Sequence, residues 1–193
     1  MPDKRSKGLN LSIFLPCFQF SFKPFILFFL LSFLFSLSSG CAENKGHKIA
    51  DVGEPAPEFT LTDLNGKMVS LREYKGRYVI LNFWATWCPS CVSEMPFLQE
   101  IYNKEKDKGI TVIGIDYNED QEKVKKFLSK YGITFTILMD NNLKVSKDYG
   151  VVGLPVTFLI DSEGRIKKKF RGELTEEIYN KYLKSEISHL KSS

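Results

Sequence analysis

Apolar residues follow two different periods along residues 52–191. Predominantly apolar runs, which are typical of strands buried on both faces, predict strands at 78–84, 110–116, 134–140 and 156–161. Apolar residues three or four positions apart predict a helix from Cys88 to about Lys108 and a second one that contains Val124 to Tyr131. Because strands alternate with helices, we expect an α/β fold in which helices flank a central mixed β-sheet.

Turn and cap residues mark the ends of these elements. The Asn-Gly pair at 65–66, inside "APEFTLTDLNGKMVSL", predicts a β-hairpin ahead of the main sheet. Asn118, with Gln121 three residues later, resembles a capping box for the second helix. The basic stretch "RIKKKF", 165–170, is interpreted as a charged edge strand that resists mispairing. A final amphipathic helix is predicted from apolar residues between 178 and 190.

The first forty residues have the pattern of a signal peptide. Basic residues precede the uncharged run 25–37, whose thirteen residues suit a signal-peptide core. Cys41 ends the motif "LSSGC", which is similar to a bacterial lipobox and makes Cys41 the expected site of lipidation. We therefore interpret 1–40 as a signal peptide or membrane-targeting segment, 41–51 as a tether and 52–191 as one globular domain.

An uncleaved membrane anchor is the alternative for this segment, because the uncharged run 24–42 has 19 residues, within the range of a tilted span. Both interpretations place the domain outside the cytoplasm, tethered to the membrane, since the basic residues come before the apolar run. Segment 1–40 carries four basic residues and one acidic residue, so the rest of the chain has a formal charge of +1 instead of +4. No basic stripe remains, and nucleic acid is not expected as a partner.

Cys88 and Cys91 form a C-x-x-C pair in "FWATWCPSC", at the junction of a predicted strand and a predicted helix. Unpaired amides and the dipole at a helix N-terminus stabilise a thiolate, so Cys88 is the expected nucleophile. Cys91 lies within reach in the first turn and can close a disulfide with Cys88 or reopen it by thiol exchange. A redox-active disulfide of this kind needs no other cofactor.

Two other uses of the pair stay open at this point. A zinc site would need further ligands, but after residue 40 the chain offers only Cys41, His47 and His189, so no metal is expected. A purely structural disulfide would suit an exported protein, yet a bond across so short a loop restrains little chain entropy. Thiol-disulfide exchange is the interpretation we prefer.

Four motifs stand in order between Val52 and Leu190: "VGEPAPEFTLTDLNGK", "LNFWATWCPSC" followed by "VSEMP", "GVVGLPVTFLID", and a Gly-bearing hairpin before a final helix. In this combination the sequence resembles the TlpA/ResA-like group of exported bacterial thiol-disulfide oxidoreductases, with their redoxin-like (AhpC/TSA) domain. The resemblance implies a thioredoxin fold with an extra N-terminal β-hairpin.

The resemblance also implies roles for residues near the cysteines. Pro155 matches the cis-proline that faces the disulfide in thioredoxin folds, and the backbone of Leu154 is implied to bind a substrate strand. Trp87 is implied to offer an exposed apolar contact to substrate, whereas Trp84 is expected in the core.

Glu94 matches a glutamate that this group carries three residues after the second cysteine. Its alternative interpretation is an ordinary carboxylate that favours the positive end of a helix. Asn82 stands where cytoplasmic thioredoxins have a buried aspartate, and an asparagine cannot titrate. This favours Glu94 as the catalytic group that manages the proton of Cys91.

The overall prediction is an exported, membrane-tethered enzyme that reduces protein disulfides. The resemblance implies a membrane thiol transporter as electron donor, and apocytochrome c, through its haem-attachment cysteines, as a substrate during cytochrome c maturation. One alternative is a peroxiredoxin-like thiol peroxidase, which shares the "PAPEFTLTDLNG" opening, although "FWATWC" lacks the proline that precedes a peroxidatic cysteine. The other is a noncatalytic haem- or copper-binding module, but copper chaperones of this superfamily space their cysteines one residue further apart.

Overall fold

The computed structural model describes residues 49–185 of the chain. The targeting segment 1–40, the lipidation site Cys41 and the tether up to residue 48 lie outside the described residues, as does the last part of the predicted C-terminal helix around Leu190.

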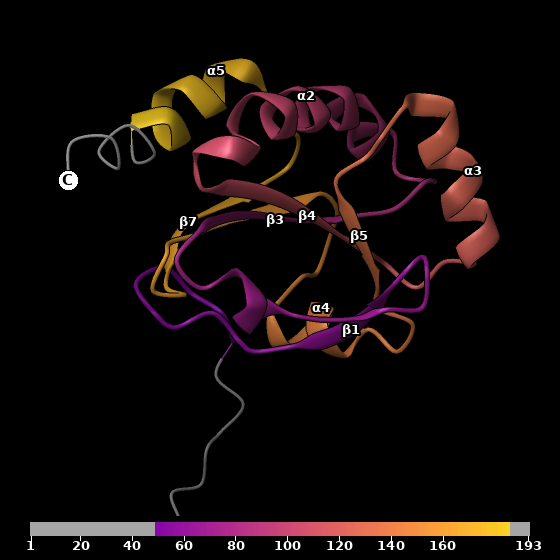
Figure 1. The fold of residues 1–193 in the computed structure, drawn as a ribbon, viewed down its shortest axis with the longest axis horizontal. Coiled ribbons are helices and arrows are strands. Elements are labelled where there is room, and N and C mark those ends of the chain that lie inside the picture. The colour runs from indigo at the N-terminus through magenta and orange to yellow at the C-terminus, as the bar shows by residue number, and fades with distance from the viewer. Residues whose placement is uncertain (1–48, 186–193) are drawn as a thin grey trace, which may run out of the picture. The chain divides into compact units, whose positions relative to one another are not determined.

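Seven strands form one mixed sheet in the order β2-β1-β5-β4-β3-β6-β7 (Figure 1). The central strands β3, β4 and β5 run parallel, β6 pairs antiparallel with β3, and β7 pairs antiparallel with β6. The hairpin β1–β2 turns at residues 65–66, as predicted, and joins the sheet through β5. The strands are β1 (Thr60–Asp63), β2 (Met68–Ser70), β3 (Tyr78–Trp84), β4 (Ile110–Asp116), β5 (Thr136–Met139), β6 (Val156–Ile160) and β7 (Ile166–Arg171).

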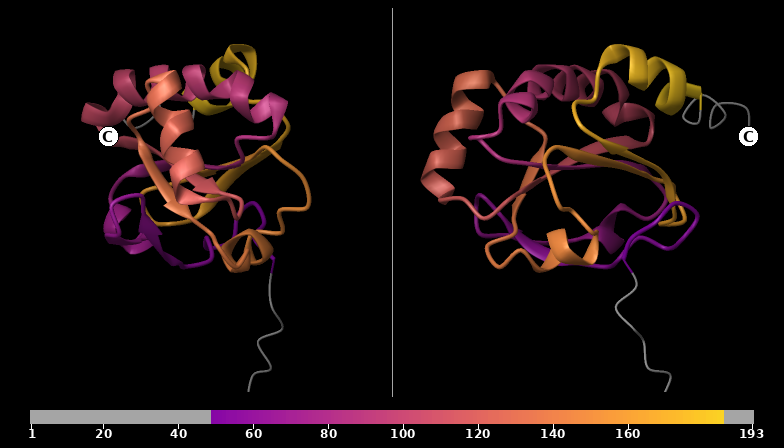
Figure 2. Two further views of the ribbon diagram at one scale, coloured as in Figure 1. Left: turned by 90° about the vertical axis from the view of Figure 1, so that its right-hand side faces the viewer. Right: turned by 180° about the vertical axis from the view of Figure 1, so that it is seen from behind.

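Alternate residues of β3 build two separate hydrophobic cores, one on each face of the sheet. Leu81 and Phe83 belong to one core, while Ile80 and Trp84 belong to the other. Because side chains alternate along a strand, Asn82 shares the face of Ile80 and Trp84. Helices cover both faces, α2 (Pro89–Glu105), α3 (Gln121–Tyr131) and α5 (Glu176–Ile178) on one and α4 (Lys144–Asp148) on the other (Figures 1 and 2). A polar residue of the central strand therefore lies on the α2 side.

Helix α2 begins and ends where the sequence predicts. Cys88 is its N-cap, and the 3-10 turn η2 (Lys106–Lys108) leads to Gly109 in the left-handed conformation (φ 82°). Helix α3 differs from the prediction, because Asp120 is its N-cap and accepts a hydrogen bond from the Lys123 amide at 3.1 Å. Asn118 adopts a left-handed conformation instead (φ 58°), which turns the chain ahead of the helix. The predicted capping box at Asn118 is wrong.

The C-terminal helix is confirmed over its described part. Thr175 caps α5 by accepting a hydrogen bond from the Ile178 amide at 3.3 Å, and the helix continues as the π-helical turn η3 (Tyr179–Leu183). Leu183 is fully buried in the core below α2, whereas Tyr182 is 40% exposed. The described part of the C-terminal helix is therefore amphipathic, as its sequence pattern indicates.

Strand β7 lies at one edge of the sheet, as predicted, and residues 50–56 cover the start of that edge. The Gly53 amide donates to the Ile166 carbonyl at 2.8 Å, and the Ile166 amide donates to the Glu54 carbonyl at 2.9 Å. We call residues 50–56 the N-terminal strap. Backbone pairing with the strap thus protects the edge together with the charged side chains of the strand.

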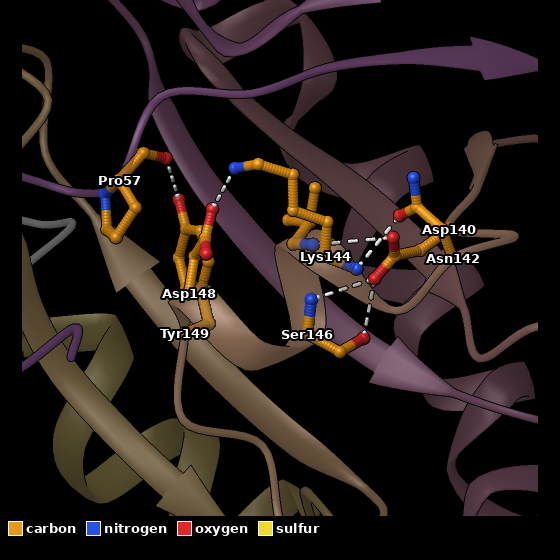
Figure 3. A network of polar contacts seen from close by, with 8 residues as sticks. Pro57, Asp140, Asn142, Lys144, Ser146, Asp148 and Tyr149 are labelled. Atoms are coloured by element: carbon orange, nitrogen blue, oxygen red, sulfur yellow. Dashed lines mark hydrogen bonds and ion pairs between the residues drawn. The ribbon is translucent and has the colours of Figure 1, made fainter. Parts of the chain in front are cut away.

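Helix α4 was not predicted, and a buried carboxylate holds it in place. Asp140 is fully buried and accepts hydrogen bonds from the amide and hydroxyl of Ser146, at 2.7 and 2.8 Å, and from the Val145 amide at 3.3 Å (Figure 3). Just after the helix, the Tyr149 hydroxyl donates to the Pro57 carbonyl at 2.8 Å. The buried side chains of Asp140 and Tyr149 therefore fix α4 against the sheet and against the segment around Pro57 that precedes β1.

We expect Asp140→Ala to lower the free energy of unfolding by about 3 kcal/mol, because it leaves buried backbone donors without an acceptor. Asn142→Ala is the matched control: its side chain accepts one bond, from the Lys144 amide at 2.9 Å, in an exposed turn, so the loss should stay below about 1 kcal/mol. Urea denaturation followed by circular dichroism measures both. Equal losses for the two variants would contradict the role assigned to Asp140.

Candidate active site

Cys88 and Cys91 form a disulfide across the first turn of α2. Their Cα atoms are 5.2 Å apart, and the Cys91 amide donates to the Cys88 sulfur at 3.2 Å. Cys88 is 5% exposed, whereas Cys91 is completely buried. The N-cap sulfur thus receives a helix amide, an arrangement that stabilises a thiolate once the bond is reduced.

A short turn carries the chain from the sheet to this disulfide. Strand β3 ends at the buried Trp84, and the Cys88 amide donates to the Ala85 carbonyl at 3.3 Å, which closes the turn. Pro89 occupies the first helical position, where its missing N–H costs nothing. Trp87 points out of the turn and is 59% exposed. The two tryptophans therefore lie as expected, one in the core and one at the surface beside the cysteines.

Glu94 lies one helical turn after Cys91 and is 1% exposed. One carboxylate oxygen accepts a hydrogen bond from the Asn82 side-chain amide at 2.7 Å, and the other accepts from the Leu174 backbone amide at 2.6 Å. Burial raises the pKa of Glu94 to about 7, against the lowering effect of these two hydrogen bonds. A carboxyl group that exchanges its proton near neutral pH is thus buried on the helix that carries both cysteines.

Asn82 connects this carboxylate to the neighbouring strand. Its side-chain nitrogen donates both to Glu94 and to the Thr157 hydroxyl, the latter at 3.0 Å. Its side-chain oxygen is buried without a hydrogen-bond partner among the described residues. Since the amide can rotate, the pair Asn82–Glu94 has a second arrangement available, in which the Asn82 oxygen accepts a hydrogen bond from the protonated carboxyl group of Glu94.

Leu154 and Pro155 reach the same end of the sheet as the cysteine turn. The peptide bond between them is cis, and Pro155 is buried directly before β6. In the antiparallel register of β6 with β3, Val156 lies opposite Phe83, two residues before Ala85 and the turn. Leu154 is half-buried and packs against both cores. The structure thus brings the predicted substrate-binding pair to the end of β3 that leads into the disulfide.

Residues that the sequence did not single out complete this region. Glu119 accepts two hydrogen bonds from Thr86, one residue before Trp87, and Asp116 holds the Glu119 amide at 2.8 Å. Burial raises the pKa of Asp116. Thr86 and Glu119 are 33 positions apart and belong to no recognisable motif, so only the fold shows that they meet.

Within residues 49–185, no group of three or more histidine, cysteine, aspartate or glutamate side chains is arranged to hold a metal ion. In the same part of the chain, none of the helices is both long and apolar enough to cross a membrane.

Comparison with known proteins agrees with this geometry. The family model named Redoxin matches residues 51–183. The chain belongs to the Redoxin family. Among curated proteins, it is 44% identical to the thiol-disulfide oxidoreductase ResA of Bacillus anthracis over 133 residues, which cover 69% of this chain and 77% of that protein. ResA of Geobacillus kaustophilus is 41% identical over 134 residues, with the same coverage.

Solved structures extend the likeness of this Redoxin family member to the fold. A putative thiol:disulfide interchange protein DsbE from Chlorobium tepidum superposes with a TM-score of 0.66 at 30% identity, covering 73% of this chain and 98% of that one. StoA from Bacillus subtilis gives 0.58 at 27% identity, covering 66% and 96%. The predicted thioredoxin fold is therefore confirmed, and the chain is a ResA-like thiol-disulfide oxidoreductase with a Cys88–Cys91 disulfide.

Proposed function

We propose that the protein works outside the cytoplasm as a reductant of protein disulfides, with Cys88 as nucleophile and Cys91 as the resolving cysteine. The observation that carries this proposal is the contrast between the two sulfurs. Cys88 caps α2 and receives an amide hydrogen bond, whereas Cys91 is entirely buried behind it. The first sulfur has the environment of a thiolate that attacks, and the second can act only from inside the protein.

The exchange takes place in two steps. The Cys88 thiolate attacks one sulfur of a substrate disulfide, which forms a Cys88–substrate bond and releases the other substrate sulfur as a thiolate. Cys91 then loses its proton and attacks Cys88, which restores the Cys88–Cys91 disulfide and releases the second substrate thiolate. The substrate gains two electrons, and the protein loses two.

Glu94 accepts the proton of Cys91 in the second step. The carboxyl group lies one turn along the same helix, and burial raises its pKa to about 7, so that it can take up a proton at neutral pH and later return it. Asn82 holds the carboxylate in place without titrating itself.

Substrate binds beside the turn that carries Trp87. The exposed indole offers an apolar surface next to Cys88, and the backbone of Leu154 ahead of the cis-Pro155 pairs with an extended substrate segment. Apocytochrome c, with its paired haem-attachment cysteines, is the substrate class that we propose, in cytochrome c maturation.

Export and membrane attachment belong to the proposal as well. They rest on the apolar segment 25–37 and on Cys41 in "LSSGC". Because disulfides form readily outside the cytoplasm, a reductant there needs a continuous supply of electrons, for which we propose a membrane thiol transporter.

The reduction potential of the purified protein tests the direction of the reaction. In a series of glutathione or dithiothreitol buffers, we expect a midpoint near about −270 mV or lower, as for thioredoxin. A value near about −120 mV, as for a strong oxidant, would contradict the proposed direction. Cys88→Ser is the control, and a peroxide assay on the same two proteins separates the peroxidase alternative, for which peroxide consumption would depend on Cys88.

A further inference from the structure

The turn that precedes Cys88 is held by hydrogen bonds to a residue in a different part of the fold. Thr86, in the middle of the turn, donates its backbone N–H to one carboxylate oxygen of Glu119 at 2.5 Å and its hydroxyl to the other at 2.6 Å. Glu119 belongs to the loop between β4 and α3, and its side chain is only 4% exposed. A buried carboxylate thus accepts two hydrogen bonds from the residue that lies two positions before the nucleophile.

Hydrogen bonds from backbone amides and a left-handed residue in the β4–α3 loop fix the position of the Glu119 carboxylate. The Tyr117 amide donates to the Trp84 carbonyl at 3.0 Å, which lays the loop beside the end of β3. The left-handed Asn118 then reverses the chain, and the Glu119 amide donates to Asp116 at 2.8 Å. Both ends of the contact with Thr86 are therefore fixed by the two central strands.

Glu119 is also kept in its ionised, accepting form. The Lys123 ammonium, in the first turn of α3, donates to the same carboxylate oxygen as the Thr86 hydroxyl, at 2.5 Å. Burial by itself would raise the pKa of Glu119, but the hydrogen bonds from Lys123 and Thr86 outweigh it and lower the pKa. The charge of the carboxylate is thus paired with that of Lys123.

We propose that Glu119 is a positioning residue for the exchange reaction, which acts through Thr86 to hold the turn so that Cys88 stays at the N-cap of α2 and Trp87 stays turned outward. A sulfur that attacks a disulfide needs alignment with the bond it breaks, and a turn free to move would spread Cys88 over unproductive positions. This inference rests on the proposed role of Cys88 as the attacking residue.

The test compares the rate constants for reduction of oxidised glutathione by four reduced proteins. We expect Glu119→Ala to be about tenfold slower than the wild type. Glu119→Gln should stay within about threefold, because its side-chain oxygen can accept the Thr86 N–H and its amide can donate to the Thr86 hydroxyl oxygen. Glu122→Ala is the matched control, since Glu122 lies on the exposed face of α3 in an ion pair with Lys125, and its rate should not change.

The rescue by glutamine separates positioning from a purely structural or charge effect. A Glu119→Ala rate equal to that of the wild type, or a Glu119→Gln rate as low as that of Glu119→Ala, would overturn the proposal. If Glu119→Ala does not fold, Thr86→Val replaces it: this variant keeps the backbone contact, should be about threefold slower, and an unchanged rate would be equally decisive against the proposal. A wild type that reduces no disulfide would instead reject the proposed function itself.

Discussion

Replacing Cys91 by serine is expected to convert the protein into a trap that holds its substrate as a mixed disulfide. Cys88 keeps its place at the N-cap of α2 and can still attack. The resolving thiol is lost, so release must wait for an external thiol, and turnover should fall by at least about 10³-fold. Mass spectrometry after addition of a peptide disulfide should show one covalent adduct per protein molecule.

Cys88→Ser is the matched control for the trap, because it leaves a cysteine in the same turn. Cys91 is completely buried and should form no adduct with the same peptide. If the Cys88→Ser protein captured the peptide as fast as Cys91→Ser does, the assignment of the two cysteines would have to be reversed.

Glu94→Gln is expected to have the second largest effect. It should slow the resolution step, and it should remove the loss of stability that the ionised Glu94 causes at pH 7 and above. Without a group that accepts the Cys91 proton, the resolution step near pH 7.5 should slow by about 10²-fold. In the wild type this step should speed up as the pH rises through about 7, where Glu94 loses its proton, and the variant should lack that rise. Stopped-flow measurement of peptide release from the mixed disulfide follows both.

The stability of the oxidised protein gives an independent measure of the same group. The pKa of Glu94 is raised from 4.5 to about 7, so the folded protein binds more protons than the unfolded chain between these values. The free energy of unfolding should therefore fall by about 3 kcal/mol as the pH rises from about 4.5 to 7, and level off above. Glu94→Gln should not show this part of the fall, although Asp116, whose pKa is also raised, contributes a fall of its own to both proteins.

A glutamine in place of Glu94 is compatible with the buried site because Asn82 can turn its amide. The side-chain oxygen of the introduced glutamine would then accept from Leu174, and its nitrogen would donate to the Asn82 oxygen that has no partner among the described residues of the wild type. Urea denaturation at pH 5 and pH 8 measures the free energy of unfolding of the wild type and of Glu94→Gln. If this free energy changes by the same amount in both proteins between the two pH values, Glu94 does not titrate in this range.

The sequence predicts the strand and the helix on either side of the cysteine pair well because their signals are local. The apolar run up to Trp84, the change to helical spacing after Cys88 and the Asn-Gly pair at 65–66 each depend on a few neighbouring residues, and the structure confirms the elements that they predict. The cap of α3 shows the limit of such signals. Asn118 and Asp120 are both good cap residues, and the choice between them depends on the left-handed turn that the chain needs at Asn118 to leave β4.

Other parts of the site depend on contacts between distant residues, which no local pattern contains. Helix α4 is five residues long and has no apolar period, and Asp140, just after β5, stabilises it by accepting hydrogen bonds from the Val145 and Ser146 amides. Glu119 meets Thr86 only because β3 and β4 are paired in register up to Trp84 and Asp116. These residues cannot be found before the order of the strands is known.

The N-terminal strap has a consequence for the order in which the chain is made. Residues 53 and 54 pair with Ile166, so the beginning of the described domain is joined to the first residue of the last strand at one edge of the sheet. During synthesis the strap leaves the ribosome more than a hundred residues before β7, and it is already present when the strand that it covers appears. The segment that covers the start of this edge is therefore available as soon as the strand is made, and every copy of the chain carries its own.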